Sequence, residues 1–337
     1  MIKTIGILAH VDAGKTSLSE QILYHTKSIR SRGRVDHKNT FLDNYEVERK
    51  RGITVFSKIA RFFYNENEYF LVDTPGHVDF SGQMERSLDI LDYAILVVSG
   101  TQKVQSHTST VFKLLKKKNI PTFIFINKID SENYFLEEVL EDIKQKLDEN
   151  IIDLTDEFKN EDFSEDVIDF IAERDENLMD IYFDSGYNRE LWNKNLIKQI
   201  KSCNIYPIFR GSALNDIGIE SFIKAFDYLT TTSYNEDEKF LAKVCNIKYE
   251  DKNKEVYIKV LSGSLNVKDE IKYFYKDKIL EEKERFRLKK IVKSFNKEKL
   301  GIIIRTEAVN CDIDKLKEDF DLLIKRKGAR SMGIIQH

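Results

Sequence analysis

An eight-residue loop, Ala9-His10-Val11-Asp12-Ala13-Gly14-Lys15-Thr16, contains the residue types that bind phosphate groups. It stands between an apolar run that predicts a strand (residues 2–8) and a predicted helix (17–24), the context that a phosphate loop requires. Backbone N–H groups and the positive end of the helix would face the phosphates, with Lys15 at the β- and γ-phosphates. The strict pattern begins with Gly, where this chain has Ala9, and the loop alone leaves the base of the nucleotide open.

Hydroxyl and carboxylate groups elsewhere could bind a magnesium ion. Thr16 closes the phosphate loop, and Asp73 ends the predicted strand 70–72 in the segment Asp73-Thr74-Pro75-Gly76-His77. Thr54 ends the segment Arg51-Gly52-Ile53-Thr54 and is a candidate second hydroxyl ligand. The predicted metal ligands are therefore Thr16, Thr54 and Asp73, with Asp73 acting through water.

His77 is the candidate catalytic residue. It follows Gly76, whose N–H group can bond the γ-phosphate, so its imidazole could orient the attacking water. The alternative is that His77 is an ordinary surface histidine. No arginine finger is evident, so we expect slow intrinsic turnover.

The segment Asn127-Lys128-Ile129-Asp130 points to guanine as the base. Its carboxylate, Asp130, can accept from N1–H and the 2-amino group, which adenine lacks, and Lys128 can pack its stem along the base. Ser212-Ala213-Leu214, at the end of a predicted strand and turn (206–212), can offer N–H groups to the guanine O6. The predicted nucleotide contacts are His10, Val11, Asp12, Ala13, Gly14, Lys15, Thr16, Ser17, Asp73, Gly76, Asn127, Lys128, Asp130, Ser212, Ala213 and Leu214.

Short apolar runs that alternate with helical stretches position these groups. Continuous runs at 93–99 and 122–126 predict buried strands of a mostly parallel sheet with helices on both faces. We expect this α/β domain to cover residues 1–236, with an acidic, mostly helical insertion at about 131–200. A solvated helical surface without function is the simpler interpretation of that insertion.

The pattern changes near residue 237. Period-two alternation at 240–249, 255–262 and 270–274 predicts an incomplete β-barrel-like domain over 237–277. Residues 278–337 predict a short α/β tail, with helices at about 280–295 and 313–325 around a strand at 301–306.

Composition limits the class of protein. The 337 residues are 41% hydrophobic and 33% charged, with a formal net charge of -3. This charge argues against an overall positive field that would attract DNA. Three cysteines and the lack of an 18-residue apolar run favour a cytoplasmic protein without a membrane segment. We expect a monomer.

Taken together, the motifs resemble those of the translational GTPases, and within them elongation factor G and the tetracycline-resistance ribosomal protection proteins. The resemblance covers about residues 1–277 and is carried by ILAHVDAGKTSLSEQILY, ERKRGITV, DTPGHVDF, RSLDILDYAILVVSG, INKID and GSALNDIGIESFI. It implies a P-loop GTPase fold, GTP or GDP with Mg²⁺, and the ribosome as partner. One departure is Lys103, where this family usually has Gly.

The tail, about residues 278–327, is similar to a fragment of the ribonuclease E/G family, through GIIIRTEA and the spacing after it. The chain thus looks like parts of two families joined together. Three functions stay open: a GTPase of the ribosomal protection type, a truncated or chimeric GTP-binding module without ribosome action, and an RNA-binding or RNA-processing protein.

Overall fold

The computed structural model describes residues 1–30, 58–74, 87–160, 162–250 and 253–265, and four short strands between 273 and 307. The chain divides into two compact units, Met1–Thr232 and Ser233–His337. Three residues with predicted roles, Thr54, Gly76 and His77, lie outside the described residues.

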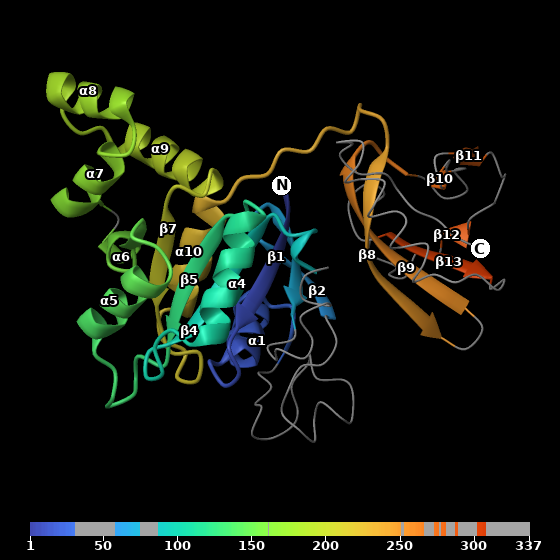
Figure 1. Cartoon of the computed structure of the whole chain (residues 1–337), viewed down its shortest axis with the longest axis horizontal. Coiled ribbons are helices and arrows are strands. Elements are labelled where there is room, and N and C mark those ends of the chain that lie inside the picture. Colours follow the sequence, from blue (N-terminus) through green and yellow to red (C-terminus); the bar gives the residue numbers. More distant parts are fainter. Residues whose placement is uncertain are drawn as a thin grey trace. The chain divides into compact units, whose positions relative to one another are not determined.

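The first unit is built on a seven-stranded sheet in the order β2-β3-β1-β4-β5-β7-β6 (Figure 1). β1 pairs in parallel with β3 and β4, β5 pairs in parallel with β4 and β7, and β2 pairs antiparallel with β3. The predicted mostly parallel α/β sheet is therefore confirmed. The strands are β1 (Ile2–Ala9), β2 (Lys58–Tyr64), β3 (Asn67–Asp73), β4 (Tyr93–Ser99), β5 (Thr122–Asn127), β6 (Ile151–Asp153) and β7 (Tyr206–Arg210).

Helices cover both faces of the sheet. Alternate residues of each strand point to opposite faces, so Ile95 and Val97 join one core with α1 and α10, while Leu96 and Val98 join a second core with α4 and α5. Burial on both faces explains the continuous apolar strand sequences. None of the described helices is long and apolar enough to cross a bilayer. The helices are α1 (Lys15–His25), α4 (Ser106–Lys117), α5 (Leu136–Lys146), α6 (Glu157–Asn160), α7 (Glu165–Ala172), α8 (Glu176–Ser185), α9 (Arg189–Lys201) and α10 (Ile219–Leu229).

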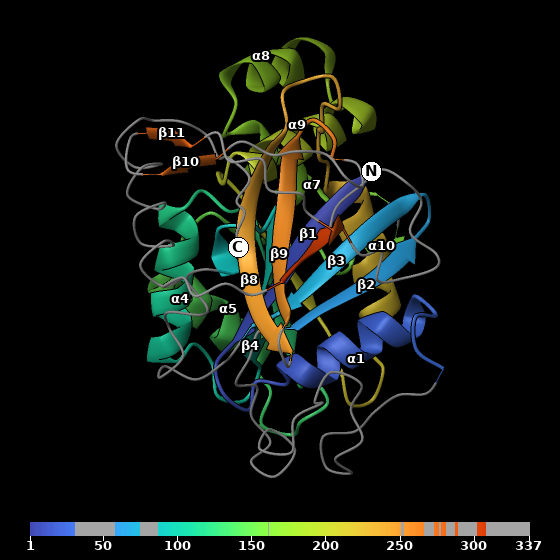
Figure 2. The ribbon, with the colours of Figure 1, turned by 90° about the vertical axis from the view of Figure 1, so that its right-hand side faces the viewer.

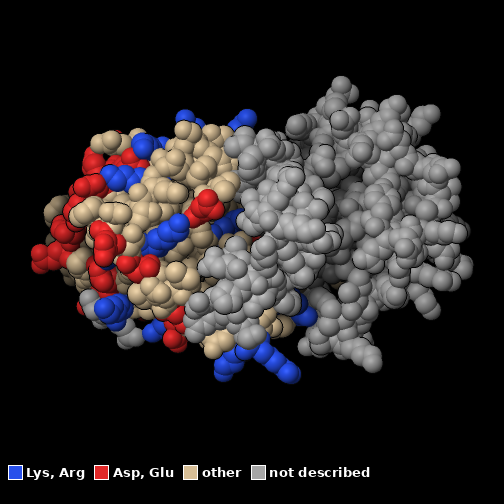
Figure 3. All heavy atoms as spheres, turned by 90° about the horizontal axis from the view of Figure 1, so that it is seen from below, with Lys and Arg blue, Asp and Glu red and all other residues tan. Residues whose placement is uncertain are grey.

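The acidic segment at 131–200 contains α5 to α9 and one strand that the helical pattern did not predict. β6 pairs in parallel with β7, with Ile151 opposite Tyr206, and forms the edge of the sheet. Three residues are too few to show a hydrophobic period, so their extended conformation depends on pairing with β7 at the edge of the sheet. Asp and Glu side chains gather at the left-hand end of Figure 3, the side on which Figure 1 shows α5 to α8.

Lys103, where the resembled family has Gly, adopts a left-handed backbone with φ of 57°. The turn after β4 requires this conformation, because the Lys103 N–H donates to the Ser99 carbonyl at 2.9 Å. A side chain at such a position is unfavourable, which explains the family's glycine. Here the Lys103 Nζ pairs with Glu138 on α5 at 2.8 Å, and this hydrogen bond raises the pKa of Lys103.

The second unit contains antiparallel strands. β8 (Leu241–Glu250) and β9 (Asn253–Ser262) lie side by side (Figure 2), near the ranges that the alternation predicted. They belong to a four-stranded sheet, β12-β13-β9-β8, with β12 (Arg287–Leu288) and β13 (Ile302–Glu307). A separate pair joins β10 (Tyr273–Tyr275) to β11 (Lys278–Leu280).

One prediction in this unit differs from the structure. The charge spacing predicted a helix at about 280–295, but Arg287–Leu288 forms β12 and pairs antiparallel with β13. Pairing with a neighbouring strand overrides the local helical preference at these residues.

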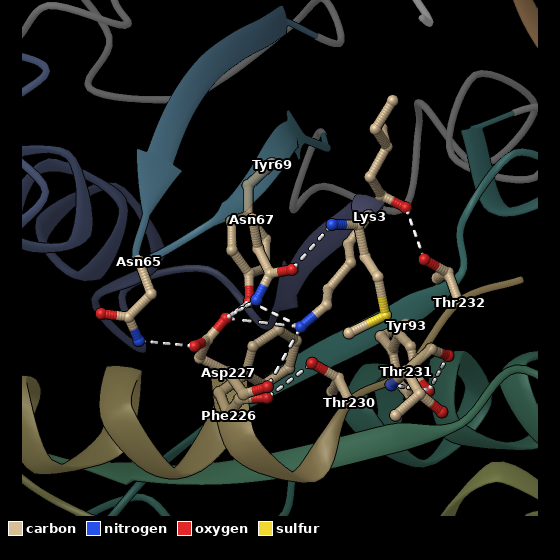
Figure 4. Close-up of polar contacts among 12 residues, drawn as sticks. Lys3, Asn65, Asn67, Tyr69, Tyr93, Phe226, Asp227, Thr230, Thr231 and Thr232 are labelled. Atoms are coloured by element: carbon tan, nitrogen blue, oxygen red, sulfur yellow. Dashed lines mark hydrogen bonds and ion pairs between the residues drawn. The ribbon is translucent and has the colours of Figure 1, made fainter.

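A buried polar cluster joins β1 and β3 to α10 at the end of the sheet where β1 begins (Figure 4). The fully buried Lys3 Nζ donates to the Tyr69 hydroxyl at 2.9 Å and to the Asp227 carbonyl at 3.0 Å. The Asp227 carboxylate accepts from Asn65 at 2.8 Å, from Asn67 at 2.6 Å and from Tyr69. Asp227 therefore ties the β2–β3 hairpin to the core.

The cluster also sets the pKa of its carboxyl group. Burial by itself would raise the pKa of Asp227, but hydrogen bonds from Tyr69, Asn65 and Asn67 and the charge of Lys3 outweigh it and hold the pKa below its usual range. A lowered pKa means that the folded state favours the carboxylate. This stabilisation is complete above about pH 4 and is lost as the pH falls through the folded-state pKa.

We predict that Asp227→Ala lowers the free energy of unfolding by about 3 to 5 kcal/mol at pH 7, because Lys3 would be left buried without its counter-charge. Urea titration measures the change. The exposed Glu220 on the same helix is the control, and Glu220→Ala should change stability by less than about 0.5 kcal/mol.

The difference between wild type and Asp227→Ala should shrink below about pH 4, where the carboxylate becomes protonated. A difference that is independent of pH, or smaller than about 1 kcal/mol at pH 7, would contradict the role of the cluster.

Candidate nucleotide-binding site

The predicted site residues that the structure describes lie at the carboxyl ends of strands, or in the loops and helix start that follow them, at one edge of the sheet. β1, β3, β5 and β7 run in parallel, so their carboxyl ends meet at that edge, with Ile7 opposite Asp73 and Ser99 opposite Asn127. Ligands of open α/β sheets bind outside the carboxyl ends of the strands. The fold therefore brings segments that are 60 to 200 residues apart in sequence into one site.

The phosphate loop is a tight turn between β1 and α1. The Ala13 N–H donates to the His10 carbonyl at 3.2 Å, and Asp12 and Gly14 adopt left-handed φ values of 62° and 96°. α1 then begins at Lys15. Its first turn contains no acidic residue, so the positive end of the helix is free of a competing carboxylate from that turn.

The side chain of Asn127 connects the phosphate loop to the segments that are predicted to read the base. Its Nδ2 donates to the Ala13 carbonyl at 2.8 Å, and its Oδ1 accepts from the Ala213 N–H at 2.9 Å. Asn127 is buried, so both amide groups need these partners. The Asn127 side chain thus fixes the phosphate loop and the segment around Ala213 relative to its own segment.

Gly14 packs directly against this amide. A Cβ atom added at Gly14 would lie 2.1 Å from Asn127 Nδ2, closer than any van der Waals contact. The left-handed φ and the absence of space both require glycine at this position.

Lys15 and Asp73, predicted to act on phosphates and on magnesium, are bonded to each other. The Lys15 Nζ donates to Asp73 Oδ1, and both side chains are buried. Thr74 beside them donates its hydroxyl to the Ile7 carbonyl at 2.8 Å, which fixes the end of β3 against β1. The lysine ammonium has three N–H donors, so it can bond a phosphate as well as a carboxylate.

The donor set fits a magnesium ion carried by a nucleotide. The described residues contain no group of three or more His, Cys, Asp or Glu side chains that could hold a metal alone. Mg²⁺ in nucleotide sites is bound by one or two protein oxygens together with phosphates and waters. The Asp73 carboxylate and the Thr16 hydroxyl are oxygen groups of this kind, and Thr16 lies in the first turn of α1.

The base side of the site is more open. Asp130 is exposed, and its Oδ2 accepts from Asn215 Nδ2 at 2.9 Å. Lys128 is half-buried with a left-handed φ of 68°, and Leu214 is 58% exposed, so both can contact a base. Ser212 is buried, and its hydroxyl accepts from the Asn215 N–H at 3.2 Å.

The remaining predicted contacts have less specific surroundings. His10 Nδ1 is buried and has no hydrogen-bond partner among the described residues, and its ring lies 6.2 Å from that of His107 on α4. Val11 and Ser17 are half-buried.

Sequence motifs did not reveal two residues that support the site. Gln21 on α1 donates to the Ala213 carbonyl at 2.6 Å, and no local pattern marks it. Asn215 directly follows the Ser212-Ala213-Leu214 motif, and its position there is the signal that could have identified it.

This sheet order, with its phosphate loop and base-reading segments, defines a P-loop GTPase fold. The family described as "Elongation factor Tu GTP binding domain" matches residues 1–232, and the chain belongs to this family. It is therefore a GTPase that binds GTP or GDP with Mg²⁺. The ribonuclease E/G family matches residues 268–330, which confirms the resemblance of the tail.

Several proteins of similar sequence align with more of this chain than its G domain. Tetracycline resistance protein TetS of Listeria monocytogenes is 38% identical over 290 residues, covering 82% of this chain and 45% of TetS. TetM from transposon Tn5251 of Streptococcus pneumoniae is 36% identical over 288 residues, with the same two shares. The chain thus spans less than half the length of these relatives.

A solved structure supports the fold. A crystal structure of a protein from Thermus thermophilus aligns with a TM-score of 0.75, covering 94% of this chain and 56% of that one. Its sequence is 19% identical to this chain, so the likeness concerns the fold alone.

We predict that Gly14→Ala weakens GDP binding by roughly tenfold or more, because the new Cβ displaces Asn127 and breaks its two loop contacts, each contributing about 1 kcal/mol. Titration with a fluorescent GDP analogue measures the affinity. Gly186→Ala is a matched control, because Gly186 also has a positive φ of 77° but nothing within 4 Å of an added Cβ. It should leave GDP binding unchanged. Equal affinities of the Gly14→Ala variant and wild type would contradict the role of Asn127.

Proposed function

We propose that the chain hydrolyses GTP with the residues named above, as a translation-factor-type GTPase of the ribosomal protection class. Asn127 carries this proposal, because its amide links the phosphate loop at Ala13 with the base-reading loop at Ala213. Phosphate binding and base recognition then belong to one site. Lys15 neutralises the β- and γ-phosphates, and Asp130 reads the guanine.

The reaction is a displacement at the γ-phosphorus. The oxygen of a water molecule forms a bond to phosphorus while the bond to the β–γ bridging oxygen breaks, and the proton of the water passes to the released phosphate. Thr16, Asp73 and Thr54 would hold a magnesium ion, which would supply charge neutralisation to the phosphates when bound. His77 orients the water, and the Gly76 N–H bonds the γ-phosphate.

The ribosome is the proposed partner, and the cytoplasm the proposed location. The supporting observation is the 36–38% identity to proteins named tetracycline resistance proteins. By this similarity the chain would act at the ribosome in tetracycline resistance. No arginine finger is evident in the sequence. Stimulation by the ribosome would therefore also complete the catalytic site.

A second candidate function is a GTP-binding module that does not act productively on ribosomes. The chain spans 44–45% of the length of these relatives. Co-sedimentation with ribosomes in GTP and in GDP separates the two candidates, because a working switch requires tighter binding in one nucleotide state. The tail match to the ribonuclease E/G family motivates an RNA-binding role, which the same sedimentation with free RNA would test.

We predict that wild type binds GTP at least roughly 100-fold more tightly than ATP, because adenine offers Asp130 neither N1–H nor a 2-amino group. Asp130→Asn should lose this preference and gain affinity for xanthosine triphosphate, whose 2-oxo group can accept from the new amide. Competition against a fluorescent GDP analogue measures both ratios. Equal displacement by ATP and GTP in wild type would contradict the guanine assignment.

We predict that His77→Ala lowers the rate of phosphate release by roughly 100-fold in the presence of ribosomes, because the attacking water loses its orienting group. GTP affinity should change by less than about twofold, since His77 is proposed to contact water and not the base. His77→Gln is the matched variant, and it should retain part of the rate. Unchanged hydrolysis by the alanine variant would remove His77 from the mechanism.

A further inference from the structure

The loop between β7 and α10 is closed into a tight turn. Ser212 and Ile217 form an antiparallel bridge with N–H to O distances of 2.9 and 3.0 Å in the two directions. Leu214 and Asn215 form the exposed tip. The Asn215 N–H donates to Ser212 Oγ at 3.2 Å, so the backbone of Asn215 is fixed inside the turn.

Contacts from two other elements hold this turn in place. Ala213 is bonded on one side to Asn127 Oδ1 at 2.9 Å and on the other to Gln21 Nε2 at 2.6 Å. Asp216 Oδ1 lies 2.6 Å from His25 Nε2 at the end of α1. The residues on both sides of the exposed tip are therefore held to β5 and to α1, which limits the directions that the Asn215 side chain can take.

The Asn215 side chain reaches Asp130. Its Nδ2 lies 2.9 Å from Asp130 Oδ2, a good geometry for a hydrogen bond to a carboxylate. An amide NH₂ is a neutral planar donor, as is the 2-amino group of guanine. The structure thus presents to one oxygen of Asp130 a planar NH₂ donor, the same kind of donor that guanine would present.

We infer that Asn215 is a specificity-determining residue that substitutes for the guanine 2-amino group at Asp130. The inference rests on the proposed role of Asp130 in reading the base. Hypoxanthine keeps N1–H but lacks the 2-amino group. When it binds, Asp130 Oδ2 retains Asn215 as its donor, so the loss of the 2-amino group is partly compensated.

Guanine differs because its 2-amino group competes with Asn215 for Oδ2. Part of the favourable contact with the 2-amino group is offset by the contact that Asn215 gives up. Asn215 therefore narrows the difference in affinity between GDP and inosine diphosphate. Removing its amide should widen that difference, through tighter GDP binding, weaker inosine diphosphate binding or both.

The test is the ratio of the dissociation constants of inosine diphosphate and GDP, measured by competition in the full chain. We expect Asn215→Ala to raise this ratio by roughly fivefold to tenfold, the range of one exposed hydrogen bond to a charged group. Asn215→Leu keeps the size of the side chain without the donor and should give the same change. The thermal unfolding midpoint of each variant shows that it is folded.

Asp216→Asn is the matched control. It alters the neighbouring residue of the same turn, whose Oδ1 lies 2.6 Å from His25 Nε2, and asparagine tolerates the left-handed φ of 62° at this position. It should change both affinities by the same factor and leave the ratio unaltered.

Suppose that GDP still binds better than ADP. The inference is then overturned if the ratio in both Asn215 variants stays within twofold of wild type or falls. If GDP does not bind better than ADP in wild type, the proposed reading of guanine by Asp130 fails, and the role of Asn215 fails with it. A raised ratio in Asp216→Asn equal to that in Asn215→Ala also overturns it, because the effect would then belong to the turn as a whole.

Discussion

The two hydrogen bonds of the Asn127 side chain are the constraint on which the nucleotide site depends. They join three segments that no local interaction would hold together, because Asn127 is 114 residues from Ala13 and 86 residues from Ala213 in the sequence. The amide is buried, so losing either partner would leave a polar group unsatisfied in the core. Gly14 has no side chain because this amide occupies the space that a Cβ would need.

The sequence contained enough information for the sheet and for most of the site. Buried parallel strands such as β4 and β5 are continuous apolar runs, and each phosphate or base segment follows one of them. The parallel arrangement then requires those segments to meet at one edge. The order of strands, by contrast, depends on contacts between distant residues, and the three-residue strand β6 has no period of its own.

Other features could not be predicted because they depend on tertiary partners. The left-handed backbone of Lys103 is set by the turn after β4, and the sequence showed only that the residue type was unusual there. The strand at Arg287–Leu288 exists because β13 offers it a pairing edge, whereas its own composition favours a helix. Asn215 reaches Asp130 across 85 positions in the chain, a distance that no motif spans.

The Asp227 cluster has a consequence for the order in which the protein can fold during synthesis. Lys3 lies on β1, but its counter-charge is 224 residues later in the chain. Until Asp227 emerges, burying that ammonium group would leave it unpaired, which is strongly unfavourable. β1 therefore cannot complete its packing as a nascent strand. The first unit has to acquire its final core late, close to the moment when α10 becomes available, and such long-range closure makes folding slow.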